Sequence, residues 1–570
     1  MQKFLRVDVR KQTVNYDPVP DEYKLLGGRG LTARILLDEV DARCSPLGEN
    51  NKIIFAPGIL GGTKAPCTGR LSVGAKSPLT QGVKESNAGG TAGHKIARLG
   101  IKAIIVEGKP SDDWFIVVVN KDGARLELAN ELVNLGNYEL SEKLRERFGK
   151  KVSIISIGQA GEYCLPVAGV AVSDLEGKPN RYAGRGGMGA VMGAKHIKAI
   201  VLDDSGTEGV SYHDKDTFSD ICKHIRKGLA ENQITGNVFP QYGTSVNIQV
   251  VNALGAIPTK NFRYGSYEHA EMISGEKMHD VIMERGGEGK TTHPCMPGCP
   301  IMCSNIYPDE QGKTIVAPME YETMAMFGSN LDIPSLDGIA HLNKLCNDYG
   351  IDTIEMGVTL GVAMDGGILA FGDVEKCKEL ITEISKGTLV GRLLGQGAEI
   401  LAKVLGAERV PAFKGQGIPA YDPRALKGNI PLYATSPMGA DHTCGNSLRV
   451  PDPLSPKGKV KASRKLQIGI ANIDNLGLCM FAGLVVGGRP DWIKSLVESR
   501  YGIDVPDTFV EDIGKEVLTT ELVFNERAGF TKDDNRVPEF LQKEPLPPHN
   551  TVCDISHEEI RQCLDFGTEL

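Results

Sequence analysis

The stretch HPCMPGCPIMCSN, residues 293–305, places Cys295, Cys299 and Cys303 four positions apart. On a helix this spacing would align the three thiols on one face. Two prolines and a glycine lie between the cysteines, however, and both residue types are strongly unfavourable inside a helix. We therefore predict a loop that presents three thiols at one place and binds an inorganic group.

The loop is typical of an iron–sulfur site. A [4Fe–4S] cluster takes four thiolates, commonly three from a short loop and one from elsewhere in the chain. The small and apolar residues around the cysteines suit a partly buried cluster that needs backbone N–H groups directed at its sulfur atoms. Zinc, with the adjacent His293 as a ligand, remains an alternative, as do free thiols. The CxxxCxxxC spacing is wider than the CxxC pairs of zinc ribbons, which favours the cluster.

The fourth thiolate has several downstream candidates. We favour Cys479, which ends the hexapeptide DNLGLC (474–479), where the glycine is expected to stop a helix. Cys377 lies in the charged run EKCKE and is expected at the surface. Cys346 and Cys444 remain open, and Cys67 is expected to be a small packed residue.

Composition limits the classes of function. The net charge of −8 and the pI of about 5.9 argue against nucleic acid as the main partner. Glycine is in excess, with 68 of 570 residues, which indicates tight turns or backbone close to a ligand. The thirteen cysteines are mostly scattered and the N-terminus reads as a strand, so we expect a reduced cytoplasmic protein. The apolar stretch 354–372 contains two acidic residues, so we expect a buried helix and no membrane span.

The predicted secondary structure changes from mainly strand to mainly helix near residue 205. Before it, short apolar runs such as KIIFAPG, KAIIVEG, WFIVVVN and KAIVLDD alternate with turn residues and predict strands. After it, runs such as FSDICKHIRKGLAENQ and VEKCKELITEISKG have helical periodicity. At this length several domains are expected, and we predict a β-rich domain at 1–208 and helical domains at 209–415 and 416–570.

Two glycine-rich segments stand out in the first domain, NAGGTAG (87–93) and RYAGRGGMGAVMGAK (181–195). The second contains GxGxxG, but a polar loop precedes it and a strand soon follows, so we reject a dinucleotide-binding fingerprint. Arg181 and Arg185 among glycines instead predict anion binding, because guanidinium groups and exposed N–H groups suit phosphate. TGRLSVGAKSP (68–78) adds Arg70 and Lys76.

The hexapeptide DNLGLC has a counterpart, NDYGID (347–352). Each follows a helical run and places Gly, then Leu or Ile, before a side chain that can bind a ligand. Both could simply be helix ends with glycine at the position after the last turn. They could also be a duplicated loop that holds a duplicated polar heterocycle, and spacing alone leaves both interpretations open.

In this order, several segments give the chain a close likeness to one family. They are GGRGLTARILLDEV, TGRLSVGAKSP, ESNAGGTAGHKIARLGIKAIIVEG, AGRGGMGAVMGAK, CMPGCPIMC, EYET, NDYGID, ATSPMGADHT and DNLGLC. Together they resemble the tungsten-containing aldehyde:ferredoxin oxidoreductase family. The resemblance implies an α+β fold whose β-rich N-terminal domain of two sheets cradles a bis-pyranopterin, followed by two mostly α-helical domains. It also implies one [4Fe–4S] cluster near the tungsten, or molybdenum, that the pterin dithiolenes hold.

The resemblance also assigns residues. It makes Cys295, Cys299, Cys303 and Cys479 the cluster ligands, although the loop has one residue more than the CxxC start of the best-known members. The hexapeptides become the two pterin-binding loops, with Asn347 in place of the usual aspartate. The remaining expected cofactor-binding residues hold the pterins, their phosphates and a bridging Mg²⁺: Arg70, Asn87, Ala88, Gly89, Arg181, Ala183, Arg185, Gly186, Gly187, Asp352, Asp474 and Leu478.

The expected catalytic residues follow from the same likeness. Glu322 or Glu320 is expected as the general base, and His442 as the donor to the carbonyl oxygen. If PMEYET is a strand the two glutamates share a face, whereas on a helix they diverge. Cys444 is expected to be a small residue in a turn, although a thiolate there could bind the metal, as in relatives that reduce aryl-CoA thioesters.

The implied function is oxidation of aldehydes to carboxylic acids, with electrons passed to ferredoxin or a ferredoxin-like subunit. A flavin-bearing subunit and a homodimer are further expectations. Two alternatives stay open: a reductive member acting on carboxylic acids or aromatic acyl-CoA thioesters, and a non-catalytic Fe–S electron-transfer subunit. Intact glycine and arginine segments, together with both hexapeptides, disfavour the non-catalytic alternative.

Overall fold

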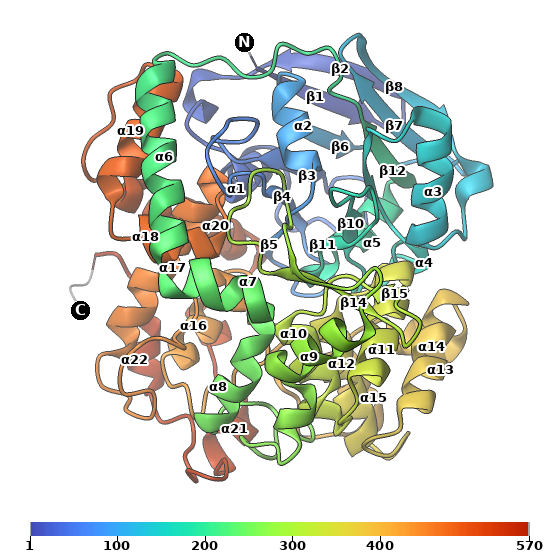
Figure 1. The fold of residues 1–570 in the computed structure, drawn as a ribbon, viewed down its shortest axis with the longest axis vertical. Coiled ribbons are helices and arrows are strands. Elements are labelled where there is room, and N and C mark those ends of the chain that lie inside the picture. Colours follow the sequence, from blue (N-terminus) through green and yellow to red (C-terminus); the bar gives the residue numbers. More distant parts are fainter. Residues whose placement is uncertain (1, 568–570) are drawn as a thin grey trace.

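The computed structural model describes residues 2–567, and the N-terminal region contains two six-stranded sheets (Figure 1). The first has the order β2-β1-β6-β3-β4-β5 and the second β11-β10-β9-β12-β7-β8. Most neighbouring strands are antiparallel, but β1 pairs in parallel with β6 and β12 with β7. The strands are β1 (Lys3–Asp8), β2 (Thr13–Pro18), β3 (Ile53–Pro57), β4 (Leu71–Lys76), β5 (Val83–Ala88), β6 (Ile101–Glu107), β7 (Phe115–Asn120), β8 (Gly123–Leu128), β9 (Ser153–Ser156), β10 (Val170–Val172), β11 (Arg181–Ala183) and β12 (Ile197–Leu202).

The central strands are apolar on both faces because both faces are covered. Phe55 of β3 and Val117 of β7 belong to a buried layer shared by the two sheets. Their neighbours Ile54 and Ile116 belong to other clusters, beneath the helices that cover the sheets. This explains the nearly continuous apolar runs by which most of these strands were predicted. The helices here are α1 (Gly28–Glu39), α2 (Ala92–Arg98), α3 (Asn137–Phe148), α4 (Gln159–Glu162) and α5 (Met188–Ala194).

The rest of the chain is mostly helical and lies below and to the left of the sheets in Figure 1. Residues 209–415 contain α6 (Lys215–Glu231), α7 (Phe239–Tyr242), α8 (Asn247–Ala253), α9 (Gly275–Arg285), α10 (Tyr321–Phe327), α11 (Leu336–Tyr349), α12 (Thr353–Asp365), α13 (Val374–Ser385), α14 (Leu389–Leu394) and α15 (Ala398–Leu405), with strands β13 (Lys290–His293), β14 (Ser304–Pro308), β15 (Thr314–Val316) and β16 (Ala412–Phe413). After β17 (Gln416–Gly417) come α16 (Asn429–Thr435), α17 (Lys459–Leu476), α18 (Gly483–Val486), α19 (Pro490–Tyr501), α20 (Phe509–Ala528), α21 (Glu539–Lys543) and α22 (His557–Arg561).

The α+β fold with two sheets followed by helices is therefore confirmed. The exact domain limits stay predictions, and the hydrophobic cores are shared between regions. Helices α17 and α20 pack against α1, and one core cluster combines residues from the first sheet with residues of α6, α17 and α20. This sharing brings the end of α17 beside the N-terminal strands.

Two local predictions are wrong. Cys377 is fully buried within α13, because the charged residues around it leave one apolar face that carries the thiol inward. The segments around Arg70 and Asn87, whose secondary structure was not predicted, contain the buried strands β4 and β5. The GxGxxG segment follows a short strand, β11, although β11 pairs antiparallel with β10, so the rejection of a dinucleotide-binding βαβ unit still holds.

Of the apolar stretch 354–372 predicted as a buried helix, the first part is α12, whose residues from Ile354 to Met364 are buried, whereas residues 366–372 are not helical and most are exposed. Within residues 2–567, no single helix is long and apolar enough to cross a membrane. One helix pair, 459–476 with 480–486, passes the same test only when joined, and it is bent by 119°.

Candidate active site

A cavity of about 350 Å³, the central cavity, is lined by residues from all three parts of the chain. It gathers most of the predicted site residues: Arg70, Asn87, Gly89, Arg181, Arg185, Cys295, Cys303, Glu320, Glu322, Asp352, His442, Asp474 and Cys479. The predicted residues that are absent from this lining are Ala88, Ala183, Gly186, Gly187, Cys299 and Leu478.

The cysteine loop, residues 294–303, joins β13 to β14 and is not helical, as predicted. Gly298 sits at its tip with a φ of +73°, which favours glycine. Two contacts fix the loop against the first sheet: the N–H of Gly90 donates to the carbonyl of Cys295 at 2.8 Å, and that of Gly69 to the sulfur of Met296 at 3.3 Å. The sheet edge therefore sets where the thiols lie.

The thiols of the loop meet Cys479 and one further cysteine. The N–H of Cys479 donates to the carbonyl of Cys67 at 2.8 Å, and the Sγ of Cys67 lies 4.0 Å from that of Cys299. Cys67 was expected to be only a packed residue; it is buried, but it also contacts two candidate cluster ligands. Burial raises the pKa of the Cys479 thiol, and the charge of Arg70 opposes that rise.

A bound [4Fe–4S] cluster fits this arrangement better than a single zinc ion. Zinc draws its ligand atoms to about 2.0–2.3 Å, so the ligands must already converge on one point. Within residues 2–567, no group of three or more His, Cys, Asp or Glu side chains is placed to hold one metal ion. His293 is also engaged, with Nε2 at 3.0 Å from Glu176 and Nδ1 at 3.3 Å from Arg181.

Both hexapeptides are helix ends, as one interpretation predicted. Helix α11 stops at Gly350 and α17 at Gly477, and each glycine has left-handed backbone angles, with φ of +74° and +72°. Gly477 also packs closely on Gly58, where a Cβ on Gly58 would lie 2.0 Å from the backbone nitrogen of Gly477. Asp352 and Asp474 nevertheless line the central cavity, so a helix-end role and a ligand role coexist.

The carboxylates of the two loops have different basic partners. Asp352 lies 3.3 Å from the Nε of Arg185 and also caps α12 through the N–H of Ile354 at 2.9 Å. Asp474 lies 3.5 Å from Arg29, whose guanidinium is held at 2.7 and 2.8 Å by the buried Glu521. Burial raises the pKa of Asp474 well above its usual value, although Arg29 opposes the shift.

The three arginines predicted to bind the cofactor differ in how many of their donors are already hydrogen-bonded within the protein. Arg185 donates to the carbonyls of Ala440 and Gly417 at 2.7 Å each, so it holds the His442 segment rather than waiting for a ligand. Arg70 is held by Asn87. Arg181 faces the cavity with its buried Nε unpartnered among the described residues, which fits an anionic group such as a pterin phosphate.

Gly186 and Lys76 are both engaged within the fold. Gly186 has a φ of +76°, and a Cβ there would lie 2.5 Å from the side chain of Lys84. Lys76 is buried, and its ammonium donates to the carbonyls of Ala42 and Cys44 at 2.6 and 2.9 Å. The prediction that Lys76 contributes to an anion site is therefore wrong.

The two candidate glutamates diverge because α10 begins between them. Glu320 precedes the helix, accepts from the hydroxyl of Thr244 and lies near Cys303. Glu322 is in the first turn, with Oε2 accepting from the N–H of Ala420 at 2.8 Å and Oε1 at 3.7 Å from the Nδ1 of His442. Glu322 Oε1 and His442 Nδ1 are buried and have no hydrogen-bond partner among the described residues, so both are free to meet a substrate. Burial raises the pKa of Glu322, while His442 opposes the rise.

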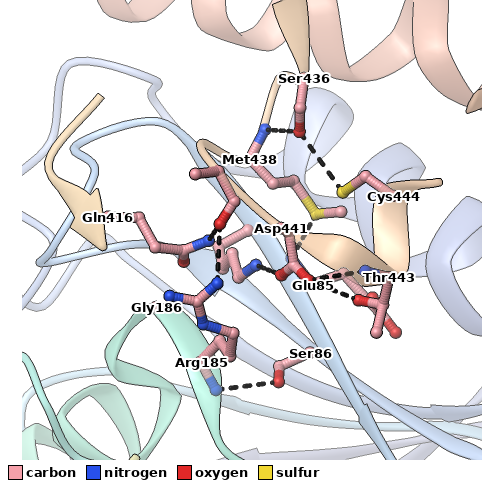
Figure 2. Close-up of polar contacts among 12 residues, drawn as sticks. Glu85, Ser86, Arg185, Gly186, Gln416, Ser436, Met438, Asp441, Thr443 and Cys444 are labelled. Carbon is pink, nitrogen blue, oxygen red and sulfur yellow. Dashed lines mark hydrogen bonds and ion pairs between the residues drawn. The ribbon is translucent and has the colours of Figure 1, made fainter. Parts of the chain in front are cut away.

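The segment that carries His442 is tied to the first sheet (Figure 2). Lys84 donates to Asp441 at 2.7 Å, and Asp441 in turn accepts from the N–H of Thr443 at 2.9 Å. Burial alone would raise the pKa of Asp441, but Lys84 and Arg185 lower it below its ordinary value, so the ion pair is maintained. The Sγ of Cys444 accepts from Ser436 at 3.3 Å, and Cys444 does not line the central cavity.

Several supporting residues were not predicted. Arg29 and Glu521 are 492 positions apart, and Lys84 and Asp441 are 357 apart, so no local pattern links them. Arg29 lies within a segment that carried the family likeness, which was the only available signal. Thr244 had none.

The comparisons with known proteins agree over nearly the whole chain. A family model described as "Aldehyde ferredoxin oxidoreductase, N-terminal domain" matches residues 4–204, and one described as "Aldehyde ferredoxin oxidoreductase, domains 2 & 3" matches residues 220–565. The "Tungsten-containing aldehyde ferredoxin oxidoreductase" of Pyrococcus horikoshii is 34% identical, covering 96% of this chain and 92% of its own. The "Aliphatic sulfonate oxidoreductase, WOR-like subunit" of Pyrococcus furiosus is 25% identical over 96% of this chain and 90% of its own.

Among solved structures, the active-site complex BamBC of benzoyl coenzyme A reductase, bound to 1,5-dienoyl-CoA, has the same fold. The TM-score is 0.81 at 21% identity, covering 99% of this chain and 93% of that chain. At this identity the likeness concerns the fold alone.

Proposed function

Because the chain belongs to the aldehyde ferredoxin oxidoreductase family and is an oxidoreductase, we propose that it oxidises aldehydes to carboxylic acids. The proposed cofactors are a tungsten, or molybdenum, bis-pyranopterin in the central cavity and one [4Fe–4S] cluster beside it. The observation that carries the proposal is that Glu322 Oε1 and His442 Nδ1 lie 3.7 Å apart, without a hydrogen bond between them, in a cavity that Cys295, Cys303 and Cys479 also line.

The residues divide the binding of the cofactors. Cys295, Cys299, Cys303 and Cys479 would hold the cluster. Asp352, the last residue of the first hexapeptide, and Asp474, the first residue of the second, would each accept hydrogen bonds from one of the two pterins. Arg181 would bind phosphate through its free Nε, and the backbone of Asn87, Ala88 and Ala183 would lie near a bridging Mg²⁺. When bound, the metal would supply the two-electron redox chemistry.

The protein's own groups would manage protons. Oxidation of an aldehyde with water yields a carboxylic acid, two protons and two electrons. Glu322 Oε1, buried and free, would accept a proton from the attacking water, and the ring N–H of His442 would donate a hydrogen bond to the carbonyl oxygen. Lys84 and Arg185 hold the His442 segment in place through Asp441 and Ala440, so His442 is presented on a fixed backbone.

The electrons would leave one at a time through the cluster to ferredoxin or a ferredoxin-like subunit. A flavin-bearing partner and a homodimer stay predictions. The reductive alternative would gain from a thiolate of Cys444 in the cavity, but Cys444 is directed at Ser436 outside the lining.

The test is aldehyde oxidation by anaerobically purified protein with benzyl viologen as acceptor. His442→Ala should lower turnover by about 10²–10⁴-fold while tungsten and iron per chain stay unchanged. Cys444→Ala, a buried change in the same segment, is the matched control and should stay near the parent rate. Normal turnover in His442→Ala, or loss of turnover in Cys444→Ala alone, would contradict the assignment.

A further inference from the structure

We propose that the ferredoxin-type acceptor docks in a second cleft, on the other side of the cysteine loop from the central cavity. This loop cleft is lined by Lys95, Arg98, Lys150, Lys151, Leu175 and Pro297, among other residues. The proposal rests on the proposed function, because it names the place where electrons leave that site. The partner is a small acidic protein that carries an iron–sulfur cluster.

The cysteine loop separates the two hollows. Cys295 and Cys303 line the central cavity, whereas Pro297, two positions after Cys295, lines the loop cleft. The next residue, Gly298, is exposed, and a Cβ placed on it would meet no atom within 4 Å. A cluster held by this loop would therefore lie directly behind the floor of an open surface cleft.

The floor of the cleft is held rigidly. The N–H of Gly62 donates to Nδ1 of the buried His94 at 2.9 Å, so the hydrogen of the neutral ring is on Nε2. The backbone of Pro297 lies close enough to this ring to oppose the lowering of the His94 pKa that burial causes. Met296, one residue earlier, is fixed by Gly69. A partner would thus meet a loop that is already anchored to the first sheet by contacts within the fold.

The charge of the cleft suits an acidic partner. Two carboxylates also line it, but both are already engaged within the fold. Asp204 pairs with Lys95 and, at 3.5 Å, with Arg98. Asp174 accepts from Asn180 at 2.7 Å and from two backbone N–H groups.

Two lysines at the rim of the loop cleft are not neutralised by a carboxylate among the described residues. Lys150 and Lys151 are exposed, and their ammonium groups have no ion pair among the described residues. The whole chain has a net charge of −8, so a positively charged hollow on it is a local reversal that would steer an acidic protein to this face. Leu175, 41% exposed, adds an apolar contact at the rim.

The electron balance requires such a place. Each aldehyde oxidised with water releases two electrons and two protons. Two oxidised acceptor molecules would each take one electron from the cluster, in succession, and would leave reduced. No bond to the acceptor forms, so a reversible electrostatic contact over the loop is sufficient for the transfer.

The test compares two charge reversals on the holoenzyme. K150E/K151E changes the rim of the loop cleft. K376E/K378E makes the same change in charge on α13, which lies at the lower right in Figure 1, away from α2 near the top. The probe is a purified acidic 2[4Fe–4S] ferredoxin. Its Kd is measured by calorimetry, and aldehyde oxidation is measured with ferredoxin and, separately, with benzyl viologen.

We expect K150E/K151E to weaken ferredoxin binding and to raise its KM by about tenfold or more, with the viologen-linked rate unchanged. The α13 variant should bind as the parent does, and added salt should weaken the parent more than K150E/K151E. An unchanged Kd in K150E/K151E, or equal losses in both variants, would overturn the docking site. Absence of any aldehyde oxidation with viologen, with ferredoxin binding intact, would instead overturn the proposed function.

Discussion

The first hexapeptide, residues 347–352, and the second, residues 474–479, have the same backbone conformation but different final side chains. Each terminates a helix at a left-handed glycine, Gly350 or Gly477. In the first the final residue, Asp352, caps α12 and meets Arg185. In the second it is Cys479, whose sulfur faces the backbone N–H groups of Phe481 and Ala482 and lies near the thiol of Cys295.

The difference shows that the helix end fixes the position and the last side chain fixes the chemistry. Asp474 adds to this, because its partner Arg29 is held by Glu521. Among the described residues, the side-chain amide of Asn347 makes one contact, at 3.4 Å to Tyr138. We therefore propose that the second hexapeptide serves both a pterin and the cluster, and that the first serves a pterin alone.

The largest expected effect, on iron content, comes from substituting the last residue of each hexapeptide, Cys479 or Asp352. Cys479→Ala should lose most of the cluster iron while keeping the pterin metal, because a [4Fe–4S] cluster needs four thiolates. Asp352→Ala should keep the iron but cost about 3 kcal/mol or more, because it removes the cap of α12 and leaves the buried Arg185 without its carboxylate. Iron and tungsten per chain, with denaturant unfolding, measure both variants. Loss of iron in Asp352→Ala to the same extent would remove the distinction.

The next largest expected effect is on the pH dependence of turnover. It concerns Glu322, which lines the central cavity together with Asp352 and Asp474 of the hexapeptides. Burial raises the pKa of Glu322, and a general base must be deprotonated, so activity should fall on acidification at a pH above the usual titration range of glutamate. Glu322→Gln should abolish most turnover at every pH, with the metals retained. Glu320→Gln, two residues away, is the control and should keep the acidic fall. If Glu320→Gln removes that fall instead, the base is Glu320.

A smaller effect separates the first residues of the hexapeptides. Asp474→Ala should cost about 1–3 kcal/mol of stability, because it leaves buried donors of Arg29 and Asn87 with one acceptor fewer. Asn347→Ala removes one long contact and should cost less than about 1 kcal/mol. Urea unfolding of the two variants side by side gives the ranking, and equal costs would show that the two positions are equivalent.

The smallest effect concerns Cys67, whose carbonyl accepts from the N–H of Cys479 in the second hexapeptide. Cys67→Ala should retain all cluster iron but lower the reduction potential of the cluster, because a thiol 4.0 Å from Cys299 can donate a weak hydrogen bond to its sulfur. A redox titration followed by electron paramagnetic resonance measures the shift. Loss of iron would mean that Cys67 is itself a ligand.

Much of the fold follows from local sequence. Most apolar runs of the first 205 residues are strands because both sheet faces are covered, and glycines 350 and 477 end their helices as their surroundings predict. Charged residues around Cys377 misled the prediction, because burial depends on one face of α13 and not on the average of its neighbours.

The site was predictable only where a residue lay in a recognisable segment. The choice between Glu320 and Glu322 needed the start of α10, which sequence spacing left open between strand and helix. The contacts of Arg29 with Glu521, and of Lys84 with Asp441, join residues hundreds of positions apart. Such pairs depend on how α20 and the His442 segment pack on the first sheet, and no local pattern encodes that packing.

The central claim is that one chain holds a pterin-bound metal and a single cluster within reach of both hexapeptides. Elemental analysis of anaerobically purified protein for tungsten, molybdenum, iron and zinc tests it most directly. The account predicts about four iron atoms and about one tungsten or molybdenum atom per chain. Zinc without iron would contradict it.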